Sequence, residues 1–428
     1  MLYAGQNAIH TNDKKAKGQF ITVQGEKYYE IANYDAMQPF FISLASDTDL
    51  WMYLASTGGL TAGRRSPEQA LFPYYTDDKI TEQYEQTGPK TILHVTLDGK
   101  TYLWEPFSQR MEGLYAIQRK IAKSTIGNKI IFCEENTTLG LRFSYLWAPA
   151  GQYGWVRRAT IENLSAQDLH ITLVDGLQNV LPAGVERKTQ NEFSTLVDGY
   201  KKTELVPNTS LVLFRMEAIL VDRAEPSEAL FCNTVYALGL TQANYFVSSQ
   251  PLHLFRQGQT WDNTAYEEAK GVRGAIFAHA SFTLAPNASQ TWYFVADVQK
   301  DATQVRDLIA FTQAPNAIET IENAIHQSTR ILEQIVAHND GVQQTADEHN
   351  DARHFANTLF NTMRGGFYLN DYTIQSDAFS AHIRVFNTAL AQKHEAFLNA
   401  LPAALQYDQL IAAVREQKDP QLLRLAYE

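Results

Sequence analysis

The sequence predicts a mainly β protein with an α-helical C-terminal region. Two observations lead to this fold class. Up to Val298, apolar and polar residues alternate with the period of two that is typical of strands, and after Lys300 apolar residues recur at helical spacing. No helix-length segments separate the strands, which indicates antiparallel sheets packed face to face. We therefore expect a large two-sheet supersandwich in residues 1–300, a helical linker in 301–350, and a partial helical domain in 351–428.

Two hairpins are the clearest strand signals. Residues 91–104 alternate around Asp98-Gly99, a dipeptide that favours tight hairpin turns. Residues 20–23 and 28–31 flank a polar connection, Gln24 to Lys27. Further strands are predicted at 139–147, 155–161, 169–174, 209–221, 231–240 and 275–298. This number of strands exceeds that of an immunoglobulin-sized sandwich and requires larger sheets.

The linker is predicted to hold two helices. Val305, Leu308 and Ile309 mark a helix that ends before Pro315. Residues 318–336 form one apolar stripe, and the polar, acidic segment 341–351 is expected to be a loop.

The helical domain is predicted from caps and stripes. Ser376 or Asp377 is expected to cap one long helix that stops near Pro402, and Asp408 to cap a short one. Asp419-Pro420 opens a last helix, with Pro at its permitted first position. Because the chain ends inside an apolar helical stretch, we expect it to be a fragment.

The composition limits which classes of molecule this chain is expected to bind. With 36 Lys+Arg against 47 Asp+Glu, the net charge is −11, so there is no positive field to attract nucleic acid. A neutral sugar suits this chain better. The first residues do not resemble a signal peptide, and no apolar run is long enough to span a membrane, so a cytoplasmic location is expected.

Cysteine and histidine patterns argue against metal or disulfide chemistry. Cys133 and Cys232 fit no zinc spacing and are expected to be buried free thiols. His349 and His354 are five residues apart and lie on different helix faces. We therefore predict no metal site. No Gly-x-Ser-x-Gly elbow occurs, which argues against a serine hydrolase.

The segment 50–80 is the richest in binding chemistry. It combines flat aromatic rings on which a sugar can stack, guanidinium donors, and carboxylate acceptors. The candidate substrate-binding residues are Trp51, Arg64, Arg65, Tyr74, Tyr75, Asp77 and Asp78. Alternatively, an Arg–Asp pair holds this loop together and the aromatic residues form local core. In either case we expect an ordered loop at the sandwich edge that faces the helical domain.

Two segments resemble a known family. The first segment comprises Ser56-Thr57-Gly58-Gly59-Leu60, Arg64-Arg65, and Phe72 to Lys79. The second comprises Trp155 to Asn163, followed by residues 169–174. They resemble the N-terminal part of proteins related to the cellobiose and chitobiose phosphorylases, which carry a galactose-mutarotase-like supersandwich before an (α/α)6 barrel. The resemblance implies inverting phosphorolysis, with inorganic phosphate as co-substrate and no other cofactor.

The family's catalytic acid lies in the later part of its barrel, so no catalytic residue is assigned in this chain. The resemblance implies the N-terminal, non-catalytic portion of an inverting disaccharide or oligosaccharide phosphorylase. The alternatives are a free-standing carbohydrate-binding or dimerisation sandwich, or part of a glycoside hydrolase. The expected partner is a disaccharide or oligosaccharide, and a homodimer is possible.

Overall fold

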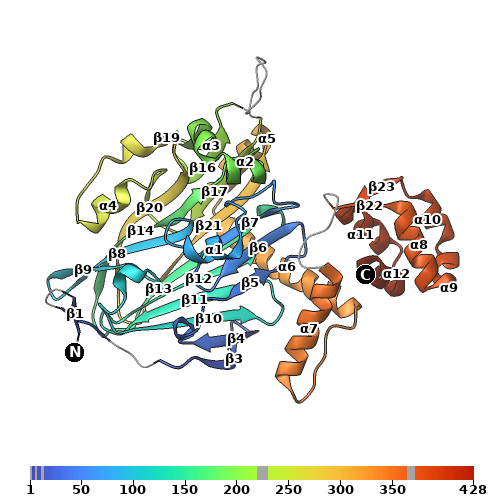
Figure 1. The fold of residues 1–428 in the computed structure, drawn as a ribbon, viewed down its shortest axis with the longest axis horizontal. Helices are drawn as coiled ribbons and strands as arrows, with labels where there is room; N and C mark the ends of the chain where they lie inside the picture. Colours follow the sequence, from blue (N-terminus) through green and yellow to red (C-terminus); the bar gives the residue numbers. More distant parts are fainter. Residues whose placement is uncertain (1, 5–6, 11–13, 219–229, 364–371) are drawn as a thin grey trace.

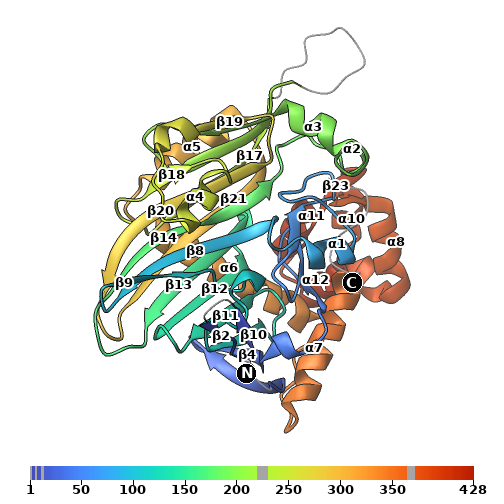
Figure 2. The same cartoon turned by 60° about the vertical axis from the view of Figure 1, so that its left-hand side comes forward.

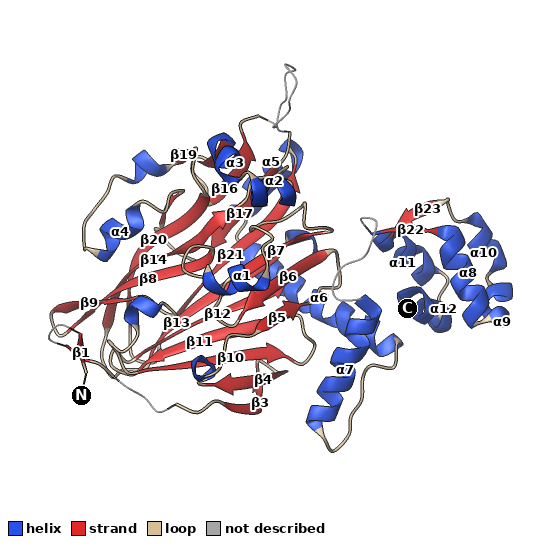
Figure 3. Ribbon diagram, viewed as in Figure 1, coloured by secondary structure: helices blue, strands red, loops and turns tan. Residues whose placement is uncertain are grey.

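The computed structural model describes residues 2–4, 7–10, 14–218, 230–363 and 372–428. Within these residues the protein is mainly β, and the strands of both large sheets pair in antiparallel fashion. Two large sheets face each other, and the helices gather in the C-terminal region (Figures 1 and 3). This confirms the predicted fold class.

The larger sheet contains 11 of the described strands. In spatial order they are β19 (Glu268–Lys270), β15 (Lys201–Leu205), β16 (Leu211–Met216), β17 (Cys232–Leu238), β21 (Ser289–Lys300), β13 (Trp155–Asn163), β12 (Leu141–Pro149), β11 (Ile130–Asn136), β10 (Ile117–Ser124), β4 (Glu26–Ala32) and β3 (Lys17–Val23).

The smaller sheets complete the β region. The five-stranded sheet has the order β18 (Asn244–Phe246), β20 (Gly274–Leu284), β14 (Leu169–Val180), β8 (Gly88–Leu97) and β9 (Lys100–Trp104). A third sheet consists of β5 (Phe41–Leu44), β6 (Leu50–Ala55) and β7 (Leu60–Arg64). The short strands β1 (Tyr3–Ala4) and β2 (Asn7–Ala8) pair near the N-terminus.

Short helices lie in the loops of the sandwich, and longer ones follow it. The loop helices are α1 (Asp77–Glu82), α2 (Arg187–Glu192), α3 (Ser194–Tyr200) and α4 (Pro251–Arg256). After the sandwich come α5 (Ala302–Thr312), α6 (Ala317–His338), α7 (Glu348–Met363), α8 (Ser376–Phe386), α9 (Thr388–Lys393), α10 (Glu395–Ala400), α11 (Tyr407–Glu416) and α12 (Pro420–Tyr427). The strands β22 (Thr373–Gln375) and β23 (Ala404–Gln406) pair with each other among these last helices.

The core between the two large sheets follows from the period-two alternation. Leu93 and Leu173 of the five-stranded sheet and Phe143, Ile161 and Trp292 of the larger sheet are fully buried there. At about 25 cal/mol per Å² of apolar surface removed from water, this core supplies the main favourable term of folding.

One ion pair is buried between the sheets. Arg157 of β13 and Asp175 of β14 are both completely buried, and the guanidinium donates to the two carboxylate oxygens at 2.6 and 3.0 Å. The same carboxylate accepts from Trp292 Nε1 and Thr91 Oγ1, each at 2.5 Å. The Tyr145 ring lies 4.9 Å from the guanidinium carbon. Each oxygen of the carboxylate is therefore hydrogen-bonded, which offsets its desolvation.

Both predicted hairpins form. Asp98 and Gly99 have positive φ, 49° and 73°, which matches the twist that antiparallel strands require. The connection of the other hairpin is shorter than expected, because the turn is Gln24-Gly25 alone. Glu26 and Lys27 already belong to β4, opposite Val23 and Thr22.

The linker helices cover the outer face of the larger sheet. Ile321 and Ile325 of α6 pack against Leu146, Val156 and Val295 of that sheet. α7 begins at Glu348, inside the segment expected to be a loop.

The long helix predicted from Ser376 to Pro402 is wrong, because the structure has α8, α9 and α10 instead. Asn387 leaves helical geometry (φ −154°, ψ 89°), and its side chain accepts from Leu390 N, which starts α9. The cap predicted at Asp408 is also wrong. Gln406 caps α11 in a reciprocal capping box with Gln409. Asp419 does cap α12, as predicted.

Helices α8–α12 and the β22–β23 pair form a unit with its own core, which we call the helical unit. Ile383, Leu398, Val414 and Leu422 are buried within it. Figure 1 shows this unit set to one side of the sandwich.

Both cysteines are free, as predicted, but Cys133 is only half-buried whereas Cys232 is buried. Burial raises the pKa of each thiol to about 12, so both remain protonated near neutral pH.

The buried ion pair yields a stability prediction. Asp175→Asn leaves Arg157 charged and unneutralised inside the core, and we expect the free energy of unfolding to fall by about 3–5 kcal/mol. Asp168→Asn, at an exposed position just before β14, is the matched control and should change it by less than about 0.5 kcal/mol. Urea unfolding followed by tryptophan fluorescence measures both. Equal stability of the two variants would contradict the central role of the pair.

Two histidines under α4 yield a pH prediction. His94 stacks on Phe255 with ring centroids 4.1 Å apart, and His279 lies 5.0 Å from the Trp261 ring. Burial lowers the pKa of both below the ordinary 6.5. The unfolded chain then binds protons more readily, so stability is fully present above about pH 6.5 and declines as the pH falls below it. In thermal melts, the Tm of His94→Phe should fall less at acidic pH than the Tm of the wild type. His170→Gln, at an exposed position, should keep the wild-type dependence of Tm on pH.

Candidate functional site

A cavity of about 410 Å³ lies where the sandwich, α6 and the helical unit meet. We call it the junction cavity. The end of the β6–β7 hairpin supplies Arg64 and Arg65, α6 supplies Ile331, α11 supplies Tyr407 and α12 supplies Tyr427. Figure 2 shows α11 and α12 beside the blue strands of the third sheet. The cavity therefore exists only when both parts of the chain are folded and in contact.

Strand register explains why charged residues gather on the sandwich side. Leu50 pairs with Arg64 at the end of the β6–β7 ladder, so Asp49 and Arg65 lie together just beyond it. The backbone N–H of Arg65 donates to the carbonyl of Asp49 at 2.8 Å. Gly63 allows the following loop to fold back, because a Cβ there would lie 2.1 Å from the Gln69 carbonyl oxygen.

Arg64 is held by several hydrogen bonds. Its Nε donates to Asp297 at 2.6 Å, Nη1 to Asp49 at 2.5 Å, and Nη2 to the Gly151 carbonyl at 2.6 Å. Burial alone lowers the pKa of Arg64, but the carboxylates of Asp297 and Asp49 raise it overall. The guanidinium thus stays charged and ties the third sheet to β21.

Arg65 is freer than Arg64. Its Nε contacts Asp49 at 3.3 Å, and 46% of its side chain is exposed. Its backbone has φ 56°, the left-handed conformation that non-glycine residues seldom adopt. The Arg65 side chain lines the junction cavity.

Asp47 lines the cavity from the loop before β6. Burial raises the pKa of its carboxyl group, although hydrogen bonds from Ser328 and Ser46 oppose that shift. Asp47 also lines an adjoining hollow of about 460 Å³, which shares Gly151, Gln152 and Ile331 with the junction cavity.

The helical unit supplies aromatic and cationic groups. Arg415 Nη2 donates to the Tyr427 hydroxyl at 2.8 Å, and burial raises the pKa of Tyr427. Tyr372 and Tyr407 line the same wall. Beneath them Ile335, Ile411 and Tyr427 pack together, which docks the unit on α6.

This arrangement suits a neutral polyhydroxylated ligand. Tyrosine rings offer flat apolar faces, while Arg65, Asp49, Asp408 and Gln406 offer donors and acceptors for hydroxyl groups. Among the described residues, no group of three or more His, Cys, Asp or Glu side chains is placed to hold a metal ion. Likewise, no described helix is long and apolar enough to cross a membrane.

Only Arg64 and Arg65 of the predicted residues line the junction cavity. Trp51 is 1% exposed and packs against Tyr53 and Tyr74, so its ring presents no free face to a sugar. Tyr74 and Tyr75 are half-buried, and the Lys79 ammonium lies 5.4 Å from the Tyr75 ring.

Asp77 and Asp78 lie elsewhere as well. They are exposed in the first turn of α1, where Thr76 hydrogen-bonds to Asp78 and lowers its pKa. The expected Arg–Asp contact does form, but with Asp49 and Asp297. Segment 50–80 is therefore not one loop but the β6–β7 hairpin, a connection and the start of α1. It is held partly by ion pairs, Trp51 lies in local core, and the end of β7 faces the helical unit as predicted.

Several lining residues escaped prediction. Asp47 and Asp49 lie just before segment 50–80. Two acidic residues directly before an apolar strand were the sequence signal that could have identified them. Tyr372, Tyr407 and Tyr427 carry no local signal, and packing of the helical unit on α6 brings Tyr407 and Tyr427 to the cavity.

The two arginines should respond differently to substitution. Arg64→Ala removes hydrogen bonds to two carboxylates and leaves Asp297, whose side chain is 4% exposed, with less compensation. We expect the free energy of unfolding to fall by about 3 kcal/mol. Arg65→Ala should change it by about 0.5 kcal/mol or less, because that side chain is half-exposed. Chemical unfolding compares them, and equal losses would contradict this division of roles.

Comparison with known proteins relates the helical unit to carbohydrate chemistry. Residues 368–428 match the family described as glycoside hydrolase family 149 insertion domain 1. No curated protein matches the sequence.

Several solved structures match parts of this chain at low sequence identity. A bacterial glucoamylase complexed with acarbose is 11% identical over 96% of this chain and 53% of its own, with a TM-score of 0.40. A protein described as a kojibiose phosphorylase from the human microbiome is 9% identical over 63% of this chain and 30% of its own (TM-score 0.34). A galactose mutarotase-like protein from Lactobacillus casei is 11% identical over 60% of this chain and 100% of its own (TM-score 0.30).

Likenesses this distant carry no functional argument. This chain spans about half the length of the glucoamylase and less of the phosphorylase. The family match agrees with the resemblance to carbohydrate-active enzymes noted in the sequence, and it supports a carbohydrate-related function for this chain.

Proposed function

We propose that this chain is the N-terminal, non-catalytic portion of a carbohydrate-active enzyme, an inverting disaccharide or oligosaccharide phosphorylase. One observation carries the proposal. The segment that matches a glycoside hydrolase family, residues 368–428, supplies one wall of the junction cavity. The complete enzyme would use inorganic phosphate as co-substrate, act in the cytoplasm and form a homodimer.

The cavity's chemistry is compatible with a sugar. Arg64 and Arg65 pair with nearby carboxylates, and Asp47 and Asp408 line the cavity together with Arg415. The site therefore has no strong net field that would select a polyanion. Tyrosine side chains combine an apolar face with a polar tip, as recognition of a sugar requires. We infer that the cavity forms part of the sugar entrance of the complete enzyme.

Phosphorolysis and hydrolysis remain the two candidate reactions. The matched family is described as a glycoside hydrolase family, which supports a reaction at a glycosidic bond. The segments 56–79 and 155–174 resemble phosphorylase-related proteins, which favours phosphorolysis. Both reactions require an acid that is positioned together with the attacking group, and no residue here is assigned that role.

We expect this chain alone to release no product from cellobiose, laminaribiose or chitobiose, with or without phosphate. Chromatography of sugar 1-phosphates and free monosaccharides, against a heat-killed control, makes the measurement. Turnover by this chain would show that it contains a catalytic centre and would overturn the non-catalytic assignment.

We also expect the chain to bind at least one of these disaccharides in the junction cavity. Removing the tyrosine ring in Tyr407→Ala should weaken binding by about two- to tenfold, in line with the worth of one aromatic contact. Tyr200→Ala, at an exposed site on α3, is the control. Titration calorimetry measures both, and equal affinities for the two variants would exclude the cavity as the binding site.

A further inference from the structure

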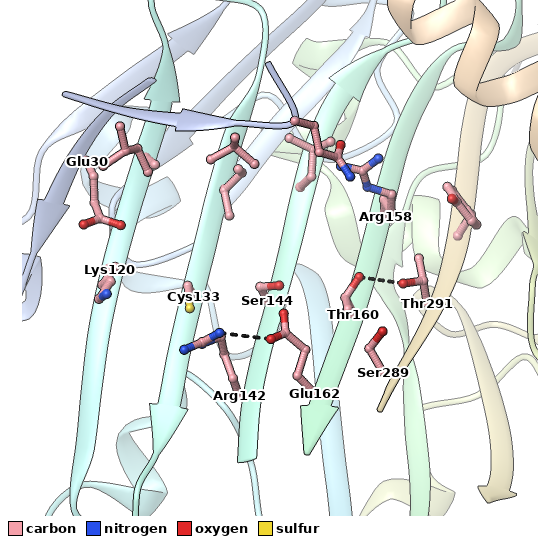
Figure 4. Close-up of a pocket in the computed structure, with 17 residues that line it drawn as sticks. Glu30, Lys120, Cys133, Arg142, Ser144, Arg158, Thr160, Glu162, Ser289 and Thr291 are labelled. Atoms are coloured by element: carbon pink, nitrogen blue, oxygen red, sulfur yellow. Dashed lines mark hydrogen bonds and ion pairs between the residues drawn. The ribbon is translucent and has the colours of Figure 1, made fainter. Parts of the chain in front are cut away.

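A second hollow, of about 630 Å³, lies on the outer face of the larger sheet. It shares no lining residue with the junction cavity. Its floor crosses six neighbouring strands, in the order β21, β13, β12, β11, β10 and β4. At about 4.8 Å between strands, the floor spans about 24 Å. We call it the outer groove (Figure 4).

The outer groove is walled, unlike a flat solvent-facing sheet. The turn of the β3–β4 hairpin reaches across the sheet, so that Gln24 accepts a hydrogen bond from Arg158 of β13 at 3.2 Å. Arg158 also binds Glu322 of α6 at 3.0 Å. The β3–β4 hairpin and α6 therefore both contact Arg158, and together they close one side of the outer groove.

Period-two alternation gives the floor its chemistry. Phe143, Ile161 and Trp292 point into the core, so the residues next to them point outward. The outward side chains are Ser144, Thr160 and Thr291, and the last two hydrogen-bond to each other at 2.9 Å. Figure 4 shows these hydroxyl groups in a row across adjacent strands.

The charges of the groove are largely paired. Arg142 binds Glu162 at 2.9 Å and Glu135 at 3.0 Å. Of the described residues that line the groove, Lys120, Ser144 and Ser289 have no side-chain hydrogen bond or ion pair. The groove therefore combines a weak net field with donors and acceptors that remain available.

Apolar groups occupy the walled side. The floor on this side is lined by Ile131, Leu146 and Tyr293, and the β3–β4 hairpin contributes Ile21 and Val23 to the wall. A ligand that presents carbon–hydrogen faces together with hydroxyl rims matches this combination. Paired charges disfavour a polyanion, and the hydroxyl row disfavours a purely apolar ligand.

We propose that the outer groove binds a neutral oligosaccharide chain longer than a disaccharide. This rests on the carbohydrate-related part of the proposed function, and it adds a second site away from the junction cavity. The groove would hold a polymeric substrate near the enzyme, which raises the local concentration of chain ends.

Bulky substitutions test the groove. Ser144→Trp fills the floor, and Ser289→Trp does so from an exposed strand end that tolerates a large side chain. Ser281→Trp places the same side chain on an exposed position of β20, in the other sheet, and is the matched control. Circular dichroism and melting temperature establish that each variant is folded. Titration calorimetry with cellohexaose, laminarihexaose and chitohexaose measures binding.

We expect at least one hexasaccharide to bind the wild type, and both groove variants to weaken it by about tenfold or more. Ser281→Trp should retain the wild-type affinity for that hexasaccharide. If Tyr407→Ala abolishes hexasaccharide binding while the folded groove variants retain it, the outer-groove proposal is overturned and the proposed function stands. If no hexasaccharide and no disaccharide binds, both proposals fail.

Discussion

Among the described residues, one ion pair buried between the two large sheets fixes the position of one sheet relative to the other. Arg157 belongs to the larger sheet and Asp175 to the five-stranded one, and neither side chain reaches water. Such a pair contributes little net stability compared with apolar residues of the same shape, but it tolerates only one relative position of the sheets. Trp292 and Thr91 donate to the same carboxylate, so any shift of register would leave several buried polar groups unsatisfied.

A second arginine extends this framework toward the helices. Arg64 joins the third sheet to β21 through Asp297, and through Gly151 to the loop that follows β12. The neighbouring Arg65 is thereby free to face the junction cavity. Two adjacent residues of the same type thus differ in role, because one lies inside the ladder register and the other lies just beyond it. The helical unit completes the cavity by docking on α6 through an apolar contact, and Arg424 of α12 also forms an ion pair at 3.0 Å with Asp340, just after α6.

The two hollows use different parts of the same architecture. The junction cavity lies at a sheet edge, where loops and a second unit converge, and its lining is rich in tyrosine and arginine. The outer groove lies on a sheet face, where alternation places hydroxyl groups in a row, and its walls come from the β3–β4 hairpin and α6. In both places arginines are neutralised by nearby carboxylates, which is consistent with a partner that carries little charge.

The sequence by itself determined the class of each region, because periodicity and turn chemistry are local. The hairpin at Asp98-Gly99, the stripe of α6 and the Asp419 cap of α12 were all predictable, since their physical causes lie within a few residues. Only the tertiary structure decided the partners. Arg64 pairs with Asp297, 233 positions away, rather than with the nearby Asp77 or Asp78. Trp51 is buried instead of facing a ligand, and Tyr407 and Tyr427 reach the cavity only by docking on α6. Contacts of this kind depend on how whole sheets and helices pack, which no local pattern of residues encodes.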